Sequence, residues 1–283
     1  MKKSFIIVAA TIIIFQFFSS CEEVIDIDLN TTESIIVVEA NITDGSGPYT
    51  VKLSKTGDFY EPSVFEKVSD ALVVISDNNG VVDTLIESEP GKYLTSVIQG
   101  IPGNTYFLYI RTESYEITAT STMPEKIELE KINYDFIFAP TPHDEDGYSI
   151  TCEFQDPEDI DNYYRFKVYR NDTLYYENKY DIYLWNDEYF DGNYVDLSIK
   201  RRGTFPFQIN DNVEVELLTY NKETYLYYTT LINSITDYTE LELMRSAFIG
   251  SFAPANPVTN LSADIVGYFA AFAVSKMDIV IEE

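Results

Sequence analysis

The stretches Tyr49-Thr50-Val51-Lys52-Leu53 and Ala71-Leu72-Val73-Val74-Ile75 decide the fold class. In the first, apolar and polar residues alternate, which is typical of a strand with one buried face. The second is a continuous apolar strand that ends at Asp77-Asn78-Asn79-Gly80, a strong turn signal. Together they predict short β-strands joined by tight turns.

Further strand-like stretches surround these two, at residues 35–38, 91–94, 105–110 and 115–119. Such closely spaced short strands are typical of an immunoglobulin-like β-sandwich, which we expect over residues 34–124. Tyr106 follows the turn Pro102-Gly103-Asn104 and matches the tyrosine that starts a late strand in such sandwiches. Pro124 marks the expected domain boundary.

Residues 125–283 are expected to form a second, β-rich domain with one α-helix. We expect paired strands at 148–154 and 163–169, further strands at 181–185, 193–199 and 212–218, and two last strands at 266–274 and 278–281. Asn221 is a good N-cap, and apolar residues recur at helical spacing after it. This pattern predicts a helix over about 221–236, and a further helical turn is expected around 241–245. The overall fold class is therefore mainly β.

The first residues have the pattern of an export signal. Lys2 and Lys3 precede an apolar run from Phe5 to Phe18, which is shorter than the roughly 20 residues of a membrane-spanning helix. Small residues then precede Cys21, and this arrangement resembles the bacterial lipobox. We expect residues 1–20 to be removed and Cys21 to carry a lipid that anchors the chain to a membrane. An ordinary signal peptide and a true membrane anchor are the alternatives.

Residues 21–33 contain this cysteine and the acidic leader that follows it. Glu22, Glu23 and Asp26 resemble the surface-export signal of Bacteroidota lipoproteins. That resemblance implies an outer-membrane lipoprotein that faces the cell surface. A solvated acidic leader without such a role is the alternative.

The charge of the chain limits its partners. The 283 residues contain 19 Lys and Arg against 47 Asp and Glu, a net charge of −28, and loss of Lys2 and Lys3 with residues 1–20 makes it −30. Such a charge repels nucleic acid and favours cations. Once Cys21 is lipidated, Cys152 has no disulfide partner, and its alternation with Ile150 and Phe154 predicts a buried core position.

Catalytic motifs are missing from the sequence. His143 is the only histidine and lies in a polar loop, and no nucleophile elbow, zinc-protease motif or phosphate-binding glycine loop occurs. We therefore expect a non-enzymatic protein. A carboxylate-based glycoside hydrolase is the one enzyme class left open, because acidic residues are abundant.

Three acidic loops, at residues 144–147, 156–161 and 187–193, offer oxygen ligands of the kind that calcium prefers. None has the spacing of a calcium hand, and solvated turns in an acidic protein are the alternative. No other cofactor is expected.

An aromatic segment around residues 175–190 is the candidate ligand-binding site. Tyr183, Trp185 and Tyr189 stand there with Asp187, and further aromatic or polar residues are Tyr175, Tyr176, Tyr180, Asp181, Asn186, Glu188 and Phe190. Aromatic faces stack on sugars, and carboxylates fix hydroxyls, so a glycan or peptide is the expected ligand. Packing of tyrosines in strands is the alternative.

Two short motifs concern modification. Asp83-Thr84-Leu85 and Asp172-Thr173-Leu174 resemble the O-glycosylation pattern of exported Bacteroidota proteins. Thr84 and Thr173 are therefore candidate glycosylation sites. Both would have to lie in exposed segments.

Several weak motifs occur together in one order along the chain. They are the acidic leader, Val37-Val38-Glu39-Ala40, Pro48-Tyr49-Thr50-Val51, Pro90-Gly91-Lys92-Tyr93, Pro102-Gly103-Asn104-Thr105-Tyr106 and Asn256-Pro257 with Gly267-Tyr268-Phe269. In this order the chain resembles the Bacteroidota lipoprotein family catalogued as domain of unknown function 4249, over residues 21–283.

The resemblance implies an accessory role beside a TonB-dependent outer-membrane transporter in nutrient uptake, because members of the family often occur next to such transporters. We expect a non-enzymatic accessory or ligand-binding partner of the transporter. A structural or adhesive cell-surface protein that binds a macromolecule is the alternative. A transporter partner predicts a flat apolar face, whereas a glycan binder predicts a cleft around Trp185.

Overall fold

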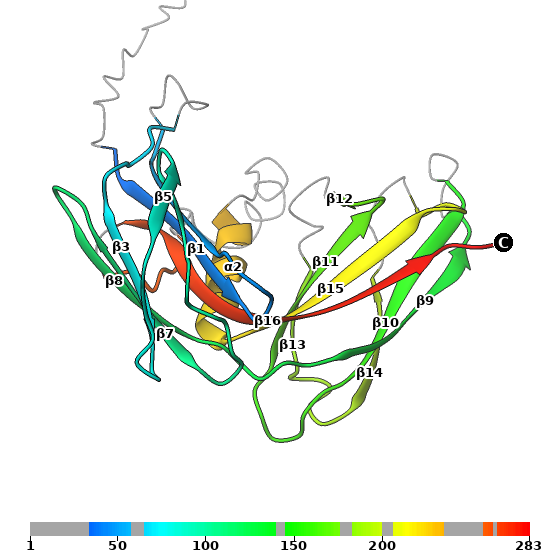
Figure 1. Cartoon of the computed structure of the whole chain (residues 1–283). Helices are drawn as coiled ribbons and strands as arrows, with labels where there is room; N and C mark the ends of the chain where they lie inside the picture. The colour runs from blue at the N-terminus through cyan, green and yellow to red at the C-terminus, as the bar shows by residue number, and fades with distance from the viewer. Residues whose placement is uncertain are drawn as a thin grey trace, which may run out of the picture. The chain divides into compact units, whose positions relative to one another are not determined.

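The computed structural model describes residues 34–57, 65–139, 145–175, 183–199, 206–234, 257–262 and 265–283. These residues form strands joined by short loops, together with one helix (Figure 1). The predicted mainly β fold class is therefore confirmed. Cys21, Glu22, Glu23, Asp26 and His143 lie outside the described residues.

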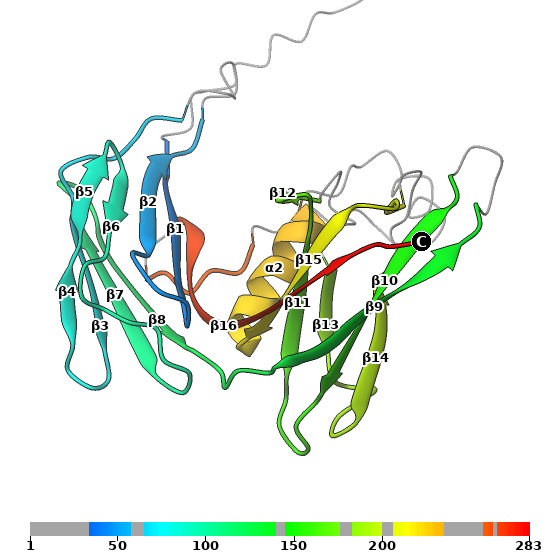
Figure 2. The ribbon, with the colours of Figure 1, turned by 45° about the vertical axis from the view of Figure 1, so that its right-hand side comes forward.

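Two sheets share the first hydrophobic core (Figure 2). One contains β1 (Ile36–Thr43), β2 (Thr50–Lys55), β6 (Lys92–Leu94) and β5 (Ile86–Glu89) in that spatial order. The other contains β4 (Val82–Thr84), β3 (Leu72–Asp77), β7 (Thr105–Arg111) and β8 (Glu116–Thr122) in that order. Their inner faces carry the alternating apolar residues that the sequence predicts, such as Val38, Leu53, Ile75 and Leu108.

Tyr106 stands at the start of β7, where the sequence predicts a corner tyrosine. Its ring is fully buried, and its hydroxyl accepts a hydrogen bond from the Ile101 backbone N–H at 2.6 Å. The same hydroxyl donates to the Gln99 carbonyl at 3.1 Å. The tyrosine therefore fixes the turn that leads into the strand.

A second core lies between a three-stranded sheet and the continuation, beyond β1, of the nine-stranded sheet that contains β1. One has β10 (Gly147–Gln155) between β9 (Leu129–Ile137) and β14 (Tyr194–Ile199). The other contains β12 (Thr173–Leu174), β11 (Tyr163–Arg170), β15 (Asn212–Tyr220) and β16 (Val266–Val280), with β13 (Tyr183–Asn186) also on β11. Cys152 is buried in this core, as predicted, and burial raises the pKa of its thiol to about 12.

The prediction that strands 148–154 and 163–169 pair with each other is wrong. β10 pairs with β9 and β14, whereas β11 pairs with β15, β12 and β13. The loop between them carries the chain from one layer of the sandwich to the other, so Phe154 and Phe166 face each other across the core, with ring centroids 6.0 Å apart. Alternation alone gives both strands an apolar face, but it does not say which neighbour each one pairs with.

The prediction of two last strands is also wrong, because β16 is one strand of 15 residues. Its first half pairs parallel with β1 and its second half antiparallel with β15. The polar Ser275 does not break the strand, since its hydroxyl accepts a bond from the Leu129 N–H at 2.9 Å and donates to Glu128 at 2.9 Å.

Strand β16 therefore joins strands from both sides of residue 124, and Ser34–Glu283 form one compact unit. The domain boundary at that residue stays a prediction. Where β16 meets β1, Gly267 has φ +114° and a Cβ there would lie 1.9 Å from the Val38 carbonyl oxygen. Only glycine permits this approach.

The helix is α2 (Lys222–Ser234), and Asn221 caps it as predicted, since its Oδ1 accepts the Thr224 N–H at 2.8 Å. Tyr228 stacks on Tyr220 of β15, with ring centroids 5.3 Å apart. The predicted end of the helix near residue 236 and the helical turn at 241–245 lie outside the described residues. No helix in the described part of the chain has the length and apolar character needed to span a membrane.

Candidate functional site

Trp185 and Tyr183, two of the residues predicted to bind a ligand, pack against the rest of the protein, and their contact with a ligand stays a prediction. Trp185 of β13 meets the buried Phe166 edge-on at 5.5 Å and stacks on Tyr183 at 5.8 Å. Both rings pack against the second core. Tyr189 is 89% exposed in the turn that follows, and Tyr176 and Tyr180 lie outside the described residues. Trp185, Tyr183 and Tyr189 line none of the three hollows described below.

Asp187 is buried beside two other carboxylates. One oxygen from each of Asp156, Asp187 and Asp191 lies within 4.8 Å of the others. The structure thereby brings together two of the three acidic loops singled out in the sequence. Of the third loop, Asp144 lies outside the described residues.

Hydrogen bonds hold these three carboxylates. Asp187 accepts the Asn162 N–H at 2.6 Å, Asp191 accepts the Asp159 N–H at 3.0 Å, and Asp156 accepts the Gly192 N–H at 2.9 Å. The Tyr164 hydroxyl donates a short hydrogen bond to Asp156. The carboxylates therefore fasten the 156–162 loop to the 187–192 turn.

The electrostatics of the cluster oppose its full ionisation. Burial raises the pKa of Asp156, and the neighbouring Asp187 and Asp191 raise it further, although bonds from Tyr164 and Gly192 act in the opposite direction. Burial and the bond to Asp156 likewise raise the pKa of Tyr164. A hard cation such as calcium would relieve this repulsion. Calcium binding here stays a prediction.

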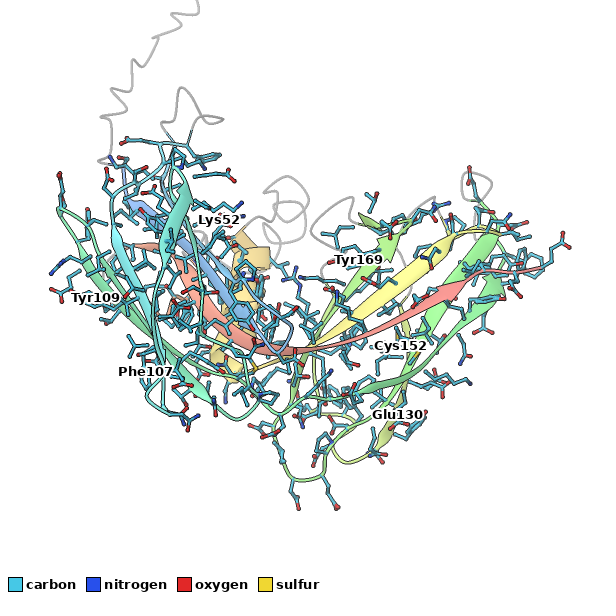
Figure 3. All side chains as sticks on the ribbon, in the orientation of Figure 1. Lys52, Phe107, Tyr109, Glu130, Cys152 and Tyr169 are labelled. Carbon is cyan, nitrogen blue, oxygen red and sulfur yellow. The ribbon has the colours of Figure 1, made fainter. Side chains whose placement is uncertain are left out.

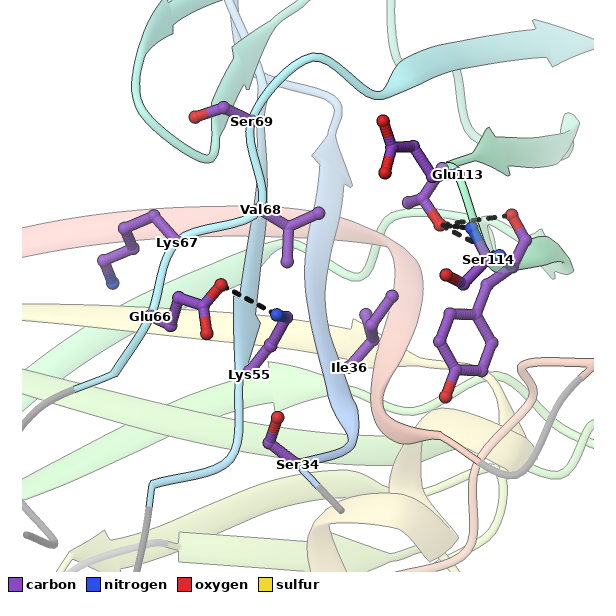
Figure 4. Close-up of a pocket in the computed structure, with 11 residues that line it drawn as sticks. Ser34, Ile36, Lys55, Glu66, Lys67, Val68, Ser69, Glu113 and Ser114 are labelled. Carbon is purple, nitrogen blue, oxygen red and sulfur yellow. Dashed lines mark hydrogen bonds and ion pairs between the residues drawn. The ribbon is translucent and has the colours of Figure 1, made fainter.

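Three hollows open on the surface of the described residues. The first, about 260 Å³, adjoins Ser34 and is lined by Lys55, Lys67, Glu66 and Glu113 among others (Figure 4). Its charges balance, and Lys55 already pairs with Glu66 at 2.7 Å. Most of its remaining lining is polar, so it offers little apolar surface to a ligand.

The second hollow, about 250 Å³, is lined by Asp172, Glu214, Glu216 and Asp278 with Lys276 and Tyr169. A hydrolase predicts facing carboxylates, and these side chains are the nearest match. However, Lys276 forms ion pairs with both Glu214 and Glu216, and Lys167 lies 3.7 Å from Glu216. The hydrogen bond to Glu216 raises the pKa of Lys276. The carboxylates of Glu214 and Glu216 are therefore occupied by ion pairs that connect β11, β15 and β16.

The third hollow, about 330 Å³, differs because its exposed lining is mainly apolar. Its walls come from residues 122–127, 157–163 and 220–222. Sequence reasoning missed it, because the prolines and isoleucines that form it are far apart in the chain.

The outer face of the β4-β3-β7-β8 sheet carries no charge at its centre. Cross-strand register places two rows there, Val82–Ser76–Phe107–Thr120 and Thr84–Val74–Tyr109–Thr118. A third pair, Thr105 and Thr122, joins hydroxyls at 2.9 Å. Charge appears only at the end of the face, at Arg111 and Glu116. We call the two rows with Thr105 and Thr122 the uncharged face.

The outer face of the β14-β10-β9 sheet provides an internal comparison. Its central row is Asp196–Glu153–Lys131, and Asp135 lies beside Ser149. The two outer faces therefore differ, since one has charges at its centre and the other only at its end. Phe107 and Tyr109 of β7 are labelled on the ribbon in Figure 3, and Phe107 is 43% exposed. The alternation of threonines at 118, 120 and 122 was the one sequence signal for this face.

The two candidate glycosylation sites lie in different surroundings. Thr173 is exposed in the β11–β12 hairpin, and so is Asp172 before it. Thr84 is exposed on the uncharged face, but Asp83 is buried and accepts backbone N–H bonds from Ser96, Val97 and Ile98 at 2.7, 2.7 and 2.9 Å. In the folded chain the first motif therefore has a structural aspartate, and glycosylation at both threonines stays a prediction.

Comparison with known proteins identifies the family. The family model described as domain of unknown function (DUF4249) matches residues 22–278. The chain therefore belongs to this family, as its sequence motifs indicate. No curated protein matches it.

Proposed function

We propose that this member of the DUF4249 family is a lipid-anchored, surface-exposed and non-enzymatic accessory protein of a TonB-dependent outer-membrane transporter. It serves nutrient uptake and docks on the transporter through the uncharged face. The lipid is attached to Cys21, and Glu22, Glu23 and Asp26 direct the chain to the cell surface.

The observation that carries the proposal is the uncharged face itself. A chain of net charge −28 normally spreads carboxylates over exposed strand positions, as it does on the β14-β10-β9 sheet. Charges are depleted at the centre of protein interfaces, and aromatic residues are enriched there. The sheet face with Phe107, Tyr109, Val74 and Val82 has that composition.

The test is a gentle affinity purification of the tagged protein from detergent-solubilised outer membranes, read by mass spectrometry. We expect stoichiometric recovery of one TonB-dependent transporter with the native chain. Phe107→Lys should lose the transporter, because it places a charge at the centre of the face. The matched control is Tyr194→Lys on the charged β14 strand, where the tyrosine is 52% exposed, and it should keep the transporter.

Recovery of the protein alone, under conditions that preserve known transporter–lipoprotein pairs, would overturn the proposal in favour of an independent adhesive or structural protein. Equal loss of the transporter in both variants would overturn the assigned face. The anchor is tested separately by metabolic labelling with palmitate. We expect label on the native chain and none on Cys21→Ala.

A further inference from the structure

The mainly apolar hollow of about 330 Å³ has the construction of a small-molecule site. Ile127 and Tyr220 are buried and form its floor, and Pro124 and Pro157 are half-buried in its walls. Ile160 stands at the rim with 58% of its surface exposed. Apolar pockets with a few convergent polar groups are the usual form of ligand sites in proteins.

Its walls are fixed before any ligand arrives. The Asn162 side chain donates to the Ile160 carbonyl at 2.7 Å, and its backbone N–H is held by the buried Asp187. On the opposite side, Asn221 Nδ2 donates to the Thr122 carbonyl at 3.0 Å. Because these bonds and two prolines set the walls, little conformational entropy is lost when a ligand binds.

The mouth of the hollow carries charges of both signs. Glu125, Asp161 and Lys222 all line it and all are exposed. Within the described residues no ion pair is formed by any of the three, in contrast to Lys55 and Lys276 of the other two hollows. Lys222 is also the first residue of α2, where the helix dipole favours a carboxylate.

We propose that this hollow binds a free apolar amino acid. The side chain enters between Ile160 and Tyr220, the ammonium group faces Glu125 and Asp161, and the carboxylate faces Lys222. The inference is independent of the transporter docking proposed above, since the hollow shares only Thr122 with the uncharged face.

Size and polarity support this ligand class over others. At about 330 Å³ the hollow lies at the small end of the range for ligand pockets, roughly 300–1,000 Å³, which suits a molecule of the size of an amino acid. A sugar would need more hydroxyl partners than a mainly apolar lining provides. A purely anionic ligand would meet two carboxylates and only one lysine.

The test is calorimetric titration of the full mature protein in detergent with phenylalanine, phenethylamine and 3-phenylpropanoate. Phenylalanine should bind at least about fivefold more tightly than either analogue, because each analogue lacks one of the two charges. Lys222→Ala should weaken the binding of phenylalanine by about fivefold and leave the affinity for phenethylamine unchanged. Equal affinity for all three compounds, or no binding of phenylalanine, would overturn the proposal.

A matched pair of variants separates a lost site from a lost fold. Ile160→Asp places a carboxylate at the apolar rim and should abolish phenylalanine binding. Ile209→Asp makes the same change at an exposed isoleucine outside the hollow, and should bind as the native chain does. Loss of binding in Ile209→Asp, or retention in Ile160→Asp with native melting temperatures, would contradict the assigned site.

Discussion

Replacing Asp83 with asparagine should destabilise the protein strongly, although the change is nearly isosteric. Asp83 is buried, with 1% of its surface exposed, and one of its oxygens accepts three backbone N–H groups from residues 96–98. Its other oxygen accepts the Ser96 hydroxyl at 2.8 Å. The asparagine keeps an acceptor for the three N–H groups but loses the charge.

The magnitude follows from the difference between charged and neutral hydrogen bonds. A bond to a charged group contributes about 1.5–3 kcal/mol and a neutral one about 0.5–1.5 kcal/mol, so three bonds lose about 3 kcal/mol in total. For a chain of this size we expect the melting temperature to fall by about 6–12 °C. Urea denaturation followed by circular dichroism measures the free energy of unfolding directly.

The dependence on pH provides a second check. Burial opposes ionisation of Asp83, but the bonds to Ile98, Val97 and Ser96 prevail and lower its pKa. The stabilisation by its charge is therefore present above the pKa of the unfolded chain and is lost as pH falls through the lower folded pKa. The difference between native and variant should shrink in that window.

Asp172→Asn is the matched control, because Asp172 precedes threonine in the same motif but lies exposed in a turn with φ +63° that asparagine tolerates. We expect its unfolding free energy to stay within about 0.5 kcal/mol of the native value. A loss below about 0.5 kcal/mol for Asp83→Asn, or a difference that is constant with pH, would refute the reasoning.

Three further outcomes follow from single residues. Gly267→Ala should prevent folding or lower the free energy of unfolding by more than about 4 kcal/mol, because its Cβ would overlap the Val38 carbonyl. Gly80→Ala, with open space around it at φ +90°, should cost only about 1–2 kcal/mol in the same denaturation assay. Equal costs would contradict the close approach at Gly267. Tyr106→Phe should lose about 1–3 kcal/mol, because the Ile101 N–H loses its acceptor, and an unchanged melting temperature would argue against this bond. Asp191→Asn should raise the melting temperature in EDTA at neutral pH, because it relieves the repulsion between the carboxylates of Asp156, Asp187 and Asp191. A lower melting temperature in the variant would contradict that repulsion. If about 5 mM calcium makes the native chain the more stable of the two, the three carboxylates hold the ion.

The local pattern of the chain predicts its elements well. Alternation in residues 49–53 and the turn at 77–80 give β2 and β3, and the Asn221 cap gives the start of α2. Tyr106 was also found from a local motif. In each case the physical cause lies within a few residues, such as a buried strand face or a capping hydrogen bond.

Features that depend on pairing between distant strands were not predicted. Tyr148–Phe154 and Tyr163–Tyr169 have the same alternation, yet they belong to opposite layers, and β16 crosses a position that looks like a break. Nothing local reveals that Phe166 meets the ring of Trp185, whose contact with a ligand stays a prediction. The uncharged face depends on the register of four strands, and the alternating threonines at 118, 120 and 122 mark only one of them.

The long strand β16 also explains how the proposed ligand hollow can stay rigid. Its walls include the segment 122–127, which connects β8 to β9. Just beyond that segment, the Ser275 hydroxyl of β16 accepts the Leu129 N–H and donates to Glu128. Just before it, the Ser121 hydroxyl accepts the Ala271 N–H of β16 at 2.9 Å and Asn221 Nδ2 at 3.2 Å. Both ends of the connection are therefore fastened to one strand. A connection held at both ends keeps Pro124 and Ile127 in place, and a preformed apolar wall is what a small ligand with an apolar side chain requires.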